Sequence, residues 1–280
     1  MLRIKSPELE KKAENIFEEC AKDFDSTKND YTDRALKYTD DVKKCSEDYY
    51  NKVPNNIDKL YSPDVTSDKS IFDKIYDQKF AKQKTVGRKY YDIIMANAKN
   101  ICPVCGTNTP TNLDHFLPIS KYPLLCVTPI NLIPTCKDCN MTKNASTSDD
   151  YYELPFHPYL ETINDCFLKC SIAFYSDGTV TFKFENGYSG DNDLKRKYMN
   201  HIKINALDKT YKSKALDMLL SDKHSYRDTL TSGKSALLAS LKSHKDSADK
   251  RDINSWRSAV YCELYNKIDE FCEWLDTPDT

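Results

Sequence analysis

The segment that decides the fold is residues 102–143, which read CPVCGTNTPTNLDHFLPISKYPLLCVTPINLIPTCKDCNMTK. It contains two C-x-x-C pairs, Cys102 with Cys105 and Cys136 with Cys139. Thiolates are soft ligands that select zinc, and each pair lets two sulfurs bind one ion from a tight turn. The spacer 106–135 is longer than the roughly 15–20 residues of a plain zinc ribbon, so it carries an insertion. The sequence therefore predicts a structural zinc site of four cysteines.

Polar residues inside and just after this insertion suit a second metal site. Asp114 and His115 are adjacent, and neighbouring side chains on a strand point to opposite faces. Both can serve one site only near a bend or a strand end, which Pro110 and Pro118 on either side allow. Asn140, directly after the last cysteine, offers a hard amide oxygen of the kind that binds Mg²⁺ beside a carboxylate.

Two further residues leave alternatives open. Lys143 follows Asn140 by three positions, so the two would share one face of a short helix, and the lysine would pair with a phosphate. The alternative is an ordinary surface lysine. Asn131 lies between Pro129 and Pro134, where an asparagine often hydrogen-bonds its own backbone in a turn. That turn role and a role in the site are compatible.

The chain has the composition of a globular protein, with 280 residues, 30% charged residues and 19 tyrosines. No apolar run approaches the roughly 18 residues that a membrane span needs, and the polar opening residues 1–6 lack the apolar core of a signal peptide. We therefore expect a cytoplasmic protein without membrane contact. In a reducing compartment the cysteines outside the pairs are expected to be free buried thiols, with Cys126 a buried thiol or a replacement zinc ligand.

The net charge of −2 and the pI near 6.2 do not favour a nucleic-acid binder, so any binding surface must be a local basic patch. One segment carries five cations and no acid: Lys79, Lys82, Lys84, Arg88 and Lys89. Such a run is usually a solvated surface. Its place just before the cysteine segment makes contact with a phosphate backbone the second interpretation.

Apolar periodicity predicts helices before the cysteine segment, over 7–24, 31–53 and 72–99, the last broken near Gly87. Ser6 would cap the first helix, and Pro7 would occupy its first helical position. The proline-rich stretch 101–157 is too irregular for long helices and suits short strands with sharp turns.

After that stretch, 167–174 and 179–184 predict a hairpin that turns at Gly178. From about residue 193 the pattern is helical again. It contains three apolar stripes that we expect in the core: Ala215, Leu216, Leu219 and Leu220; Leu237, Leu238 and Leu241; and Trp256, Val260, Leu264 and Ile268.

Taken together, the positions from Cys102 to Lys143 resemble the HNH endonuclease family in its zinc-ribbon-stabilised form. The resemblance implies a ββα-metal core in which His115 is the general base and Asp114 and Asn140 bind a catalytic Mg²⁺ or Mn²⁺. It implies that Asn131 holds the loop that orients His115. The third signature position is Asn140 instead of histidine, a frequent variant in the family that leaves the metal preference open.

The expected fold is therefore α+β and mostly helical. A small ββα-metal core with a four-cysteine zinc site would be flanked by N-terminal helices and by a β-hairpin with C-terminal helices. We expect three regions: helices over 1–75, the zinc-stabilised nuclease core over 76–165, and the hairpin with the last helices over 166–280.

The resemblance implies an endonuclease that hydrolyses DNA with one divalent metal. The alternatives are a zinc-ribbon binding or scaffold subunit without cleavage and an RNA-cleaving nuclease. Shorter stretches, around His157, over the hairpin, and at 254–257 with Tyr261, are similar to bacterial HNH proteins of anti-phage operons that include an ATPase. Expected partners are DNA, an ATPase or another defence subunit, and a second copy of the chain. His157 is either a further active-site group or a loop-capping histidine.

Overall fold

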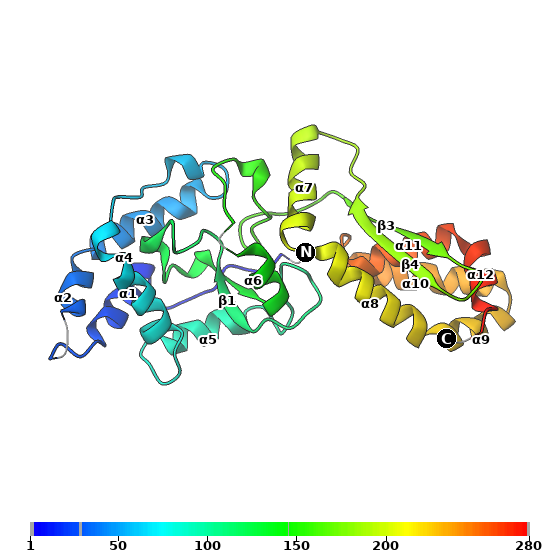
Figure 1. Cartoon of the computed structure of the whole chain (residues 1–280), viewed down its shortest axis with the longest axis horizontal. Helices are drawn as coiled ribbons and strands as arrows, with labels where there is room; N and C mark the ends of the chain where they lie inside the picture. The colour runs from blue at the N-terminus through cyan, green and yellow to red at the C-terminus, as the bar shows by residue number, and fades with distance from the viewer. Residues whose placement is uncertain (1–2, 28–29, 145, 279–280) are drawn as a thin grey trace. The chain divides into compact units, whose positions relative to one another are not determined.

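A computed structural model describes residues 3–27, 30–144 and 146–278; the first two residues of the polar opening segment lie outside these ranges. Contacts divide the chain into two compact units, an N-terminal unit of Leu2–Thr162 and a C-terminal unit of Ile163–Thr280 (Figure 1). The predicted class is confirmed: the fold is α+β and mostly helical, with two small antiparallel hairpins. No helix of the described ranges is long and apolar enough to cross a membrane.

The N-terminal unit holds the cysteine segment among short helices. Its main elements are α1 (Ala13–Lys22), α2 (Tyr31–Leu36), α3 (Thr39–Lys52), α4 (Lys69–Lys74), a π-helical turn (Ile75–Phe80), α5 (Arg88–Ala96), β1 (Asn112–His115), β2 (Leu132–Thr135) and α6 (Lys137–Lys143). Short 3₁₀ turns lie at Ile57–Lys59, Thr66–Asp68, Pro123–Leu125, Pro129–Asn131 and Tyr151–Glu153. The order β1, β2, α6 places a hairpin directly before a short helix.

The prediction of a helix from Pro7 with a Ser6 cap is wrong, because α1 begins only at Ala13. The preceding residues instead form a strap whose backbone bonds to distant parts of the unit. The Ile4 N–H donates to the Pro158 carbonyl (3.1 Å), and the side-chain Nδ2 of Asn97 donates to the Lys5 carbonyl (2.6 Å). These tertiary hydrogen bonds tie residues 4 and 5, just before the predicted helix start, to distant parts of the unit.

The single helix predicted over 31–53 is two helices, α2 and α3, and the break coincides with a buried charge. Asp68 is 3% exposed and accepts hydrogen bonds from Arg34 Nε (2.9 Å) and the Tyr38 hydroxyl (2.7 Å). Lys37, Tyr38 and Arg34 together hold the pKa of Asp68 well below its usual range. Lys37 and Tyr38 are the residues between the helices, so turning the chain there brings both to the carboxylate.

The predicted break near Gly87 is confirmed. Helical structure stops at Phe80 and resumes at Arg88. A Cβ atom at Gly87 would lie 2.7 Å from Cys20 Sγ and from the Lys79 carbonyl oxygen, so only glycine lets the chain approach α1 this closely.

The C-terminal unit is built on the predicted hairpin. β3 (Leu168–Phe174) pairs antiparallel with β4 (Val180–Asn186) from Leu168 opposite Asn186 to Phe174 opposite Val180. Gly178 takes a φ of 86° in the connecting turn, which glycine adopts without strain. Around the hairpin lie α7 (Asn192–Ile204), α8 (Leu207–Ser221), α9 (Lys223–Thr231), α10 (Lys234–Arg251), α11 (Trp256–Asn266) and α12 (Ile268–Leu275). α8 packs on β4 and α11 on β3 (Figure 1).

The three predicted apolar stripes differ in burial. All four residues of the α11–α12 stripe, from Trp256 to Ile268, are buried. In α8, however, Leu216 and Leu220 are 39% and 42% exposed, so that stripe is only half core. Leu238 in α10 is likewise only partly buried. A two-stranded sheet has little area, so a helix on its flank covers it with a narrow face and leaves the adjoining apolar residues in solvent.

Candidate functional site

The four cysteines of the two C-x-x-C pairs come together as predicted. Their sulfur atoms all lie within 4.8 Å of one another, and all four residues are buried. In the first pair the Gly106 N–H donates to the Cys102 carbonyl (2.8 Å), closing a tight turn that Gly106 completes with a φ of 69°. Cys136 is the N-cap of α6 and Cys139 lies in its first turn. Four thiolates at this separation could hold a zinc ion, and Cys126 is not one of the group.

The hairpin next to this cluster carries Asp114 and His115 at the end of β1. Asp114 is paired with Ile133 and His115 with Leu132 of β2. The strand ends here, as the flanking prolines allowed, and the next N–H, that of Phe116, donates to the Asn131 carbonyl (2.8 Å). Asp114 stays partly exposed while His115 is buried.

Three tyrosines brace this small sheet, and sequence reasoning missed all of them. The Tyr76 hydroxyl donates to the Leu113 carbonyl (2.9 Å), and the Tyr91 hydroxyl accepts from the Leu113 N–H (3.3 Å). The Tyr159 hydroxyl donates to the Leu132 carbonyl (2.9 Å). Backbone groups that no third strand satisfies thereby find partners. The only sequence signal was the high tyrosine content, which does not say which tyrosines are involved.

The imidazole of His115 has a defined tautomer. Its Nε2 lies 2.9 Å from the Cys126 carbonyl oxygen, and because a carbonyl only accepts, Nε2 carries the proton. The lone pair is therefore on Nδ1. The ring also packs edge-on against Tyr76, with centroids 4.4 Å apart. Burial lowers the pKa of His115 to about 4, so the ring is neutral and Nδ1 is an acceptor near pH 7.

Asn131 is fully buried and clamps the loop after β1. Its Oδ1 accepts from the Leu117 N–H (2.8 Å), and its Nδ2 donates to the Leu117 carbonyl (3.1 Å) and, more weakly, to the Leu125 carbonyl (3.5 Å). The side chain thus bonds to backbone at two points within the insertion. These contacts hold the backbone two residues beyond His115 in place.

Lys143 is not the surface lysine that one interpretation allowed. It is 4% exposed, and its ammonium group lies 2.9 Å from Asp114 Oδ2 and 2.8 Å from the His115 carbonyl oxygen. Burial raises the pKa of Asp114 while Lys143 opposes that rise. Asn140 lies three residues earlier on α6, on the same side of the helix, and is partly exposed. That Lys143 binds a phosphate group stays a prediction.

His157 has the contacts of a loop-holding residue. It is fully buried, its Nδ1 accepts the Tyr159 N–H (3.2 Å), and its Nε2 lies 3.0 Å from the Tyr49 hydroxyl. A backbone N–H only donates, so Nδ1 is unprotonated and Nε2 carries the proton. The ring is further packed against Phe116 at a centroid distance of 4.3 Å. Of the two interpretations, these contacts favour loop capping.

The basic run 79–89 is largely neutralised within the unit. Lys79 pairs with Asp23 (3.1 Å), Arg88 with Asp92 (2.8 Å), and Lys89 with Glu19 (3.6 Å). Lys82 and Lys84 are the exposed cations of the loop between the π-helical turn and α5. The run therefore presents less positive charge than its sequence indicates.

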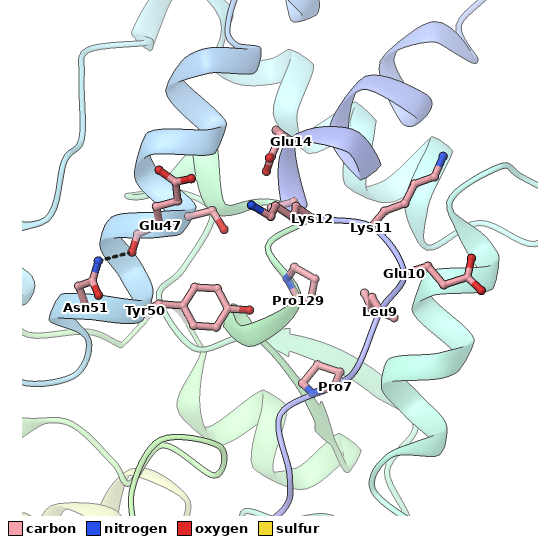
Figure 2. Close-up of a pocket in the computed structure, with 12 residues that line it drawn as sticks. Pro7, Leu9, Glu10, Lys11, Lys12, Glu14, Glu47, Tyr50, Asn51 and Pro129 are labelled. Carbon is pink, nitrogen blue, oxygen red and sulfur yellow. Dashed lines mark hydrogen bonds between the residues drawn. The ribbon is translucent and has the colours of Figure 1, made fainter.

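A pocket of about 710 Å³ lies elsewhere in the N-terminal unit, lined by the strap from Pro7, the start of α1, one side of α3, and Pro129 (Figure 2). Tyr50 reaches into it from α3, and carboxylates and ammonium groups both line it. Its wall contains none of the predicted site residues. Pro129, two residues before Asn131, is its connection with the insertion.

No protein-family model matches the chain, and no solved structure matches it. The chain is similar to Protein ea31 of Escherichia phage lambda, with 28% identity over 196 residues. The match covers 64% of this chain and 66% of the phage protein, so about a third of the relative's length has no counterpart in the alignment. The printed name of that relative states no activity.

Proposed function

We propose that the chain is a metal-dependent endonuclease of the HNH type that hydrolyses DNA. The observation that supports this most directly is the β1–β2–α6 arrangement, which puts Asp114 and His115 at a strand end beside α6. The four-cysteine cluster at the start of α6 braces the same arrangement. A hairpin of four-residue strands needs such support, because a two-stranded sheet is marginal by itself.

In this proposal His115 deprotonates the attacking water. The water proton goes to Nδ1, because Nε2 already carries a proton donated to the Cys126 carbonyl. Asn131 keeps the ring in position by fixing the following loop. The water oxygen attacks phosphorus, the bond to the 3′ oxygen breaks, and the departing oxygen takes a proton from solvent, which leaves a 5′-phosphate and a 3′-hydroxyl.

Asp114 and Asn140 are the residues that would hold the catalytic Mg²⁺ or Mn²⁺. Both offer hard oxygen ligands, and both are partly exposed on neighbouring elements. Such an ion would stabilise negative charge on the phosphate and on the leaving oxygen. The structural zinc would be held by Cys102, Cys105, Cys136 and Cys139.

Nicking of supercoiled plasmid by the purified chain tests the proposal. With Mg²⁺ or Mn²⁺ we expect the wild type to nick the plasmid. The nicking rate should fall by about 10²–10⁴-fold in His115→Ala, because the general base is lost. His224→Ala, at an exposed histidine of α9, is the matched control and should keep full activity. Equal nicking by wild type and His115→Ala would contradict the assignment. Matched DNA and RNA oligonucleotides in the same assay separate the DNA nuclease from the RNA-cleaving alternative.

We further propose that targeting depends on a partner, such as an ATPase or another anti-phage defence subunit, or on a second copy of the chain. The net charge is −2, and three of the five cations in the basic run are paired with acids. Phosphate neutralisation drives nonspecific affinity, so the isolated chain should bind random duplex DNA with a Kd of about 1–100 µM or weaker at about 0.15 M salt. Fluorescence anisotropy measures this. Nanomolar binding by the isolated chain would remove the need for a targeting partner.

A further inference from the structure

The ion pair between Lys143 and Asp114 is largely closed off from water. The Lys143 side chain is 6% exposed and that of Asp114 is 13% exposed. Lys143 is the last residue of α6 and reaches back to the end of β1. One ammonium group thereby contacts the Asp114 carboxylate and the His115 carbonyl at the same time.

A carboxylate with this little exposure to water needs a partner that compensates its charge. In this structure Lys143 is that partner for Asp114. A divalent cation on the same carboxylate would meet the ammonium group at close range, and like charges repel strongly in a poorly solvated site. The lysine and the metal therefore cannot both neutralise Asp114 fully.

We propose that Lys143 is a built-in counter-ion that occupies Asp114 in the metal-free protein, and that a divalent cation binds by displacing it. The inference rests on the proposed function, since it assumes that Asp114 is a metal ligand. The lysine stem is flexible, so Nζ can leave Asp114 while it keeps the His115 carbonyl. The displaced ammonium then needs an anion, which the phosphodiester supplies. Metal and substrate consequently strengthen each other's binding.

Mn²⁺ affinity without substrate, followed by electron paramagnetic resonance of the free ion, tests the competition. Lys143→Met should bind Mn²⁺ about tenfold more tightly than wild type, because no ammonium has to be displaced. Lys137→Met is the matched control: this lysine lies on the same helix but is exposed, and its loss should leave the affinity unchanged. We would work at pH 8, so that the Asp114 carboxyl stays ionised.

Asp114→Asn distinguishes a failure of the competition from a failure of the metal site itself. If Asp114→Asn abolishes Mn²⁺ binding but Lys143→Met binds like wild type, the competition is wrong and the metal site stands. If neither the wild type nor Lys143→Met binds Mn²⁺, or if the binding does not depend on Asp114, both the metal site and the competition are wrong.

A measurement on the wild type covers the case in which Lys143→Met does not fold. The Lys143 side-chain ammonium, held by two hydrogen bonds away from solvent, should give an observable ¹⁵N signal. Titration with Mg²⁺ should shift this signal as the bond to Asp114 breaks. A signal that stays unchanged while the Asp114 carboxyl ¹³C resonance responds to Mg²⁺ would overturn the proposal.

Discussion

Cys136→Ser is expected to lose the bound zinc and to unfold the β1–β2–α6 segment. Cys136 is a member of the four-sulfur cluster and directly precedes α6, so loss of its sulfur opens the candidate zinc site at the point where the helix begins. Structural zinc contributes about 10–16 kcal/mol in zinc-finger peptides, far more than four-residue strands can replace. Metal analysis by mass spectrometry should find one zinc per wild-type chain and much less in the variant. Hydrogen exchange should show lost protection over residues 102–143.

Cys166→Ser is the control for this experiment, because Cys166 lies outside the cluster and is exposed, so the prediction that it is buried is wrong. It should keep both the zinc and the exchange protection. A Cys136→Ser protein that still carries one zinc per chain, with unchanged protection, would show that the cluster is not a zinc site. If the wild-type protein contains no zinc but has the same fold, packing alone holds the β1–β2 hairpin.

Asn131→Ala should destabilise the protein and also abolish nicking. The truncation leaves the Leu117 N–H and carbonyl without their partner in a fully buried place. Each buried polar group left unsatisfied costs about 1–3 kcal/mol, so the expected loss in free energy of unfolding is about 2–6 kcal/mol. Urea denaturation measures this loss. The freed loop should also release His115 from its fixed orientation, so the folded fraction should be inactive.

The control is Asn112→Ala, on the same strand as His115 but only partly buried. It should change the free energy of unfolding by less than about 1 kcal/mol, as substitutions away from buried contacts usually do. If Asn131→Ala had the stability and activity of Asn112→Ala, the clamp would be irrelevant to the site. Retained zinc in Asn131→Ala would show that the loss of activity does not pass through the cysteine cluster.

Much of the local structure was predictable because its causes lie within a few residues. The C-x-x-C spacing predicted the cysteine cluster, since each pair closes its own turn before the two pairs meet. The alternating sequence pattern on either side of Gly178 predicted the β3–β4 hairpin, and the break near Gly87 was also predicted. Two predictions were wrong: the start of α1 and a single helix over 31–53. Both places contact residues far away in the sequence: Ile4 bonds to Pro158, and Lys37 pairs with Asp68. The local apolar pattern carries no information about such contacts.

The sequence by itself determined the two cysteine pairs, the hairpin turn, the mostly helical α+β class and the identities of the candidate site residues. The tertiary structure decided what those residues touch. It pairs Lys143 with Asp114, and it places the Cys126 carbonyl so that the His115 proton lies on Nε2. It also places three tyrosine hydroxyls against the backbone of the two strands: Tyr76, Tyr91 and Tyr159. The physical reason is range. Turn and ligand chemistry acts between residues a few positions apart, whereas the partner of a buried charge or hydroxyl is set by which distant elements pack together.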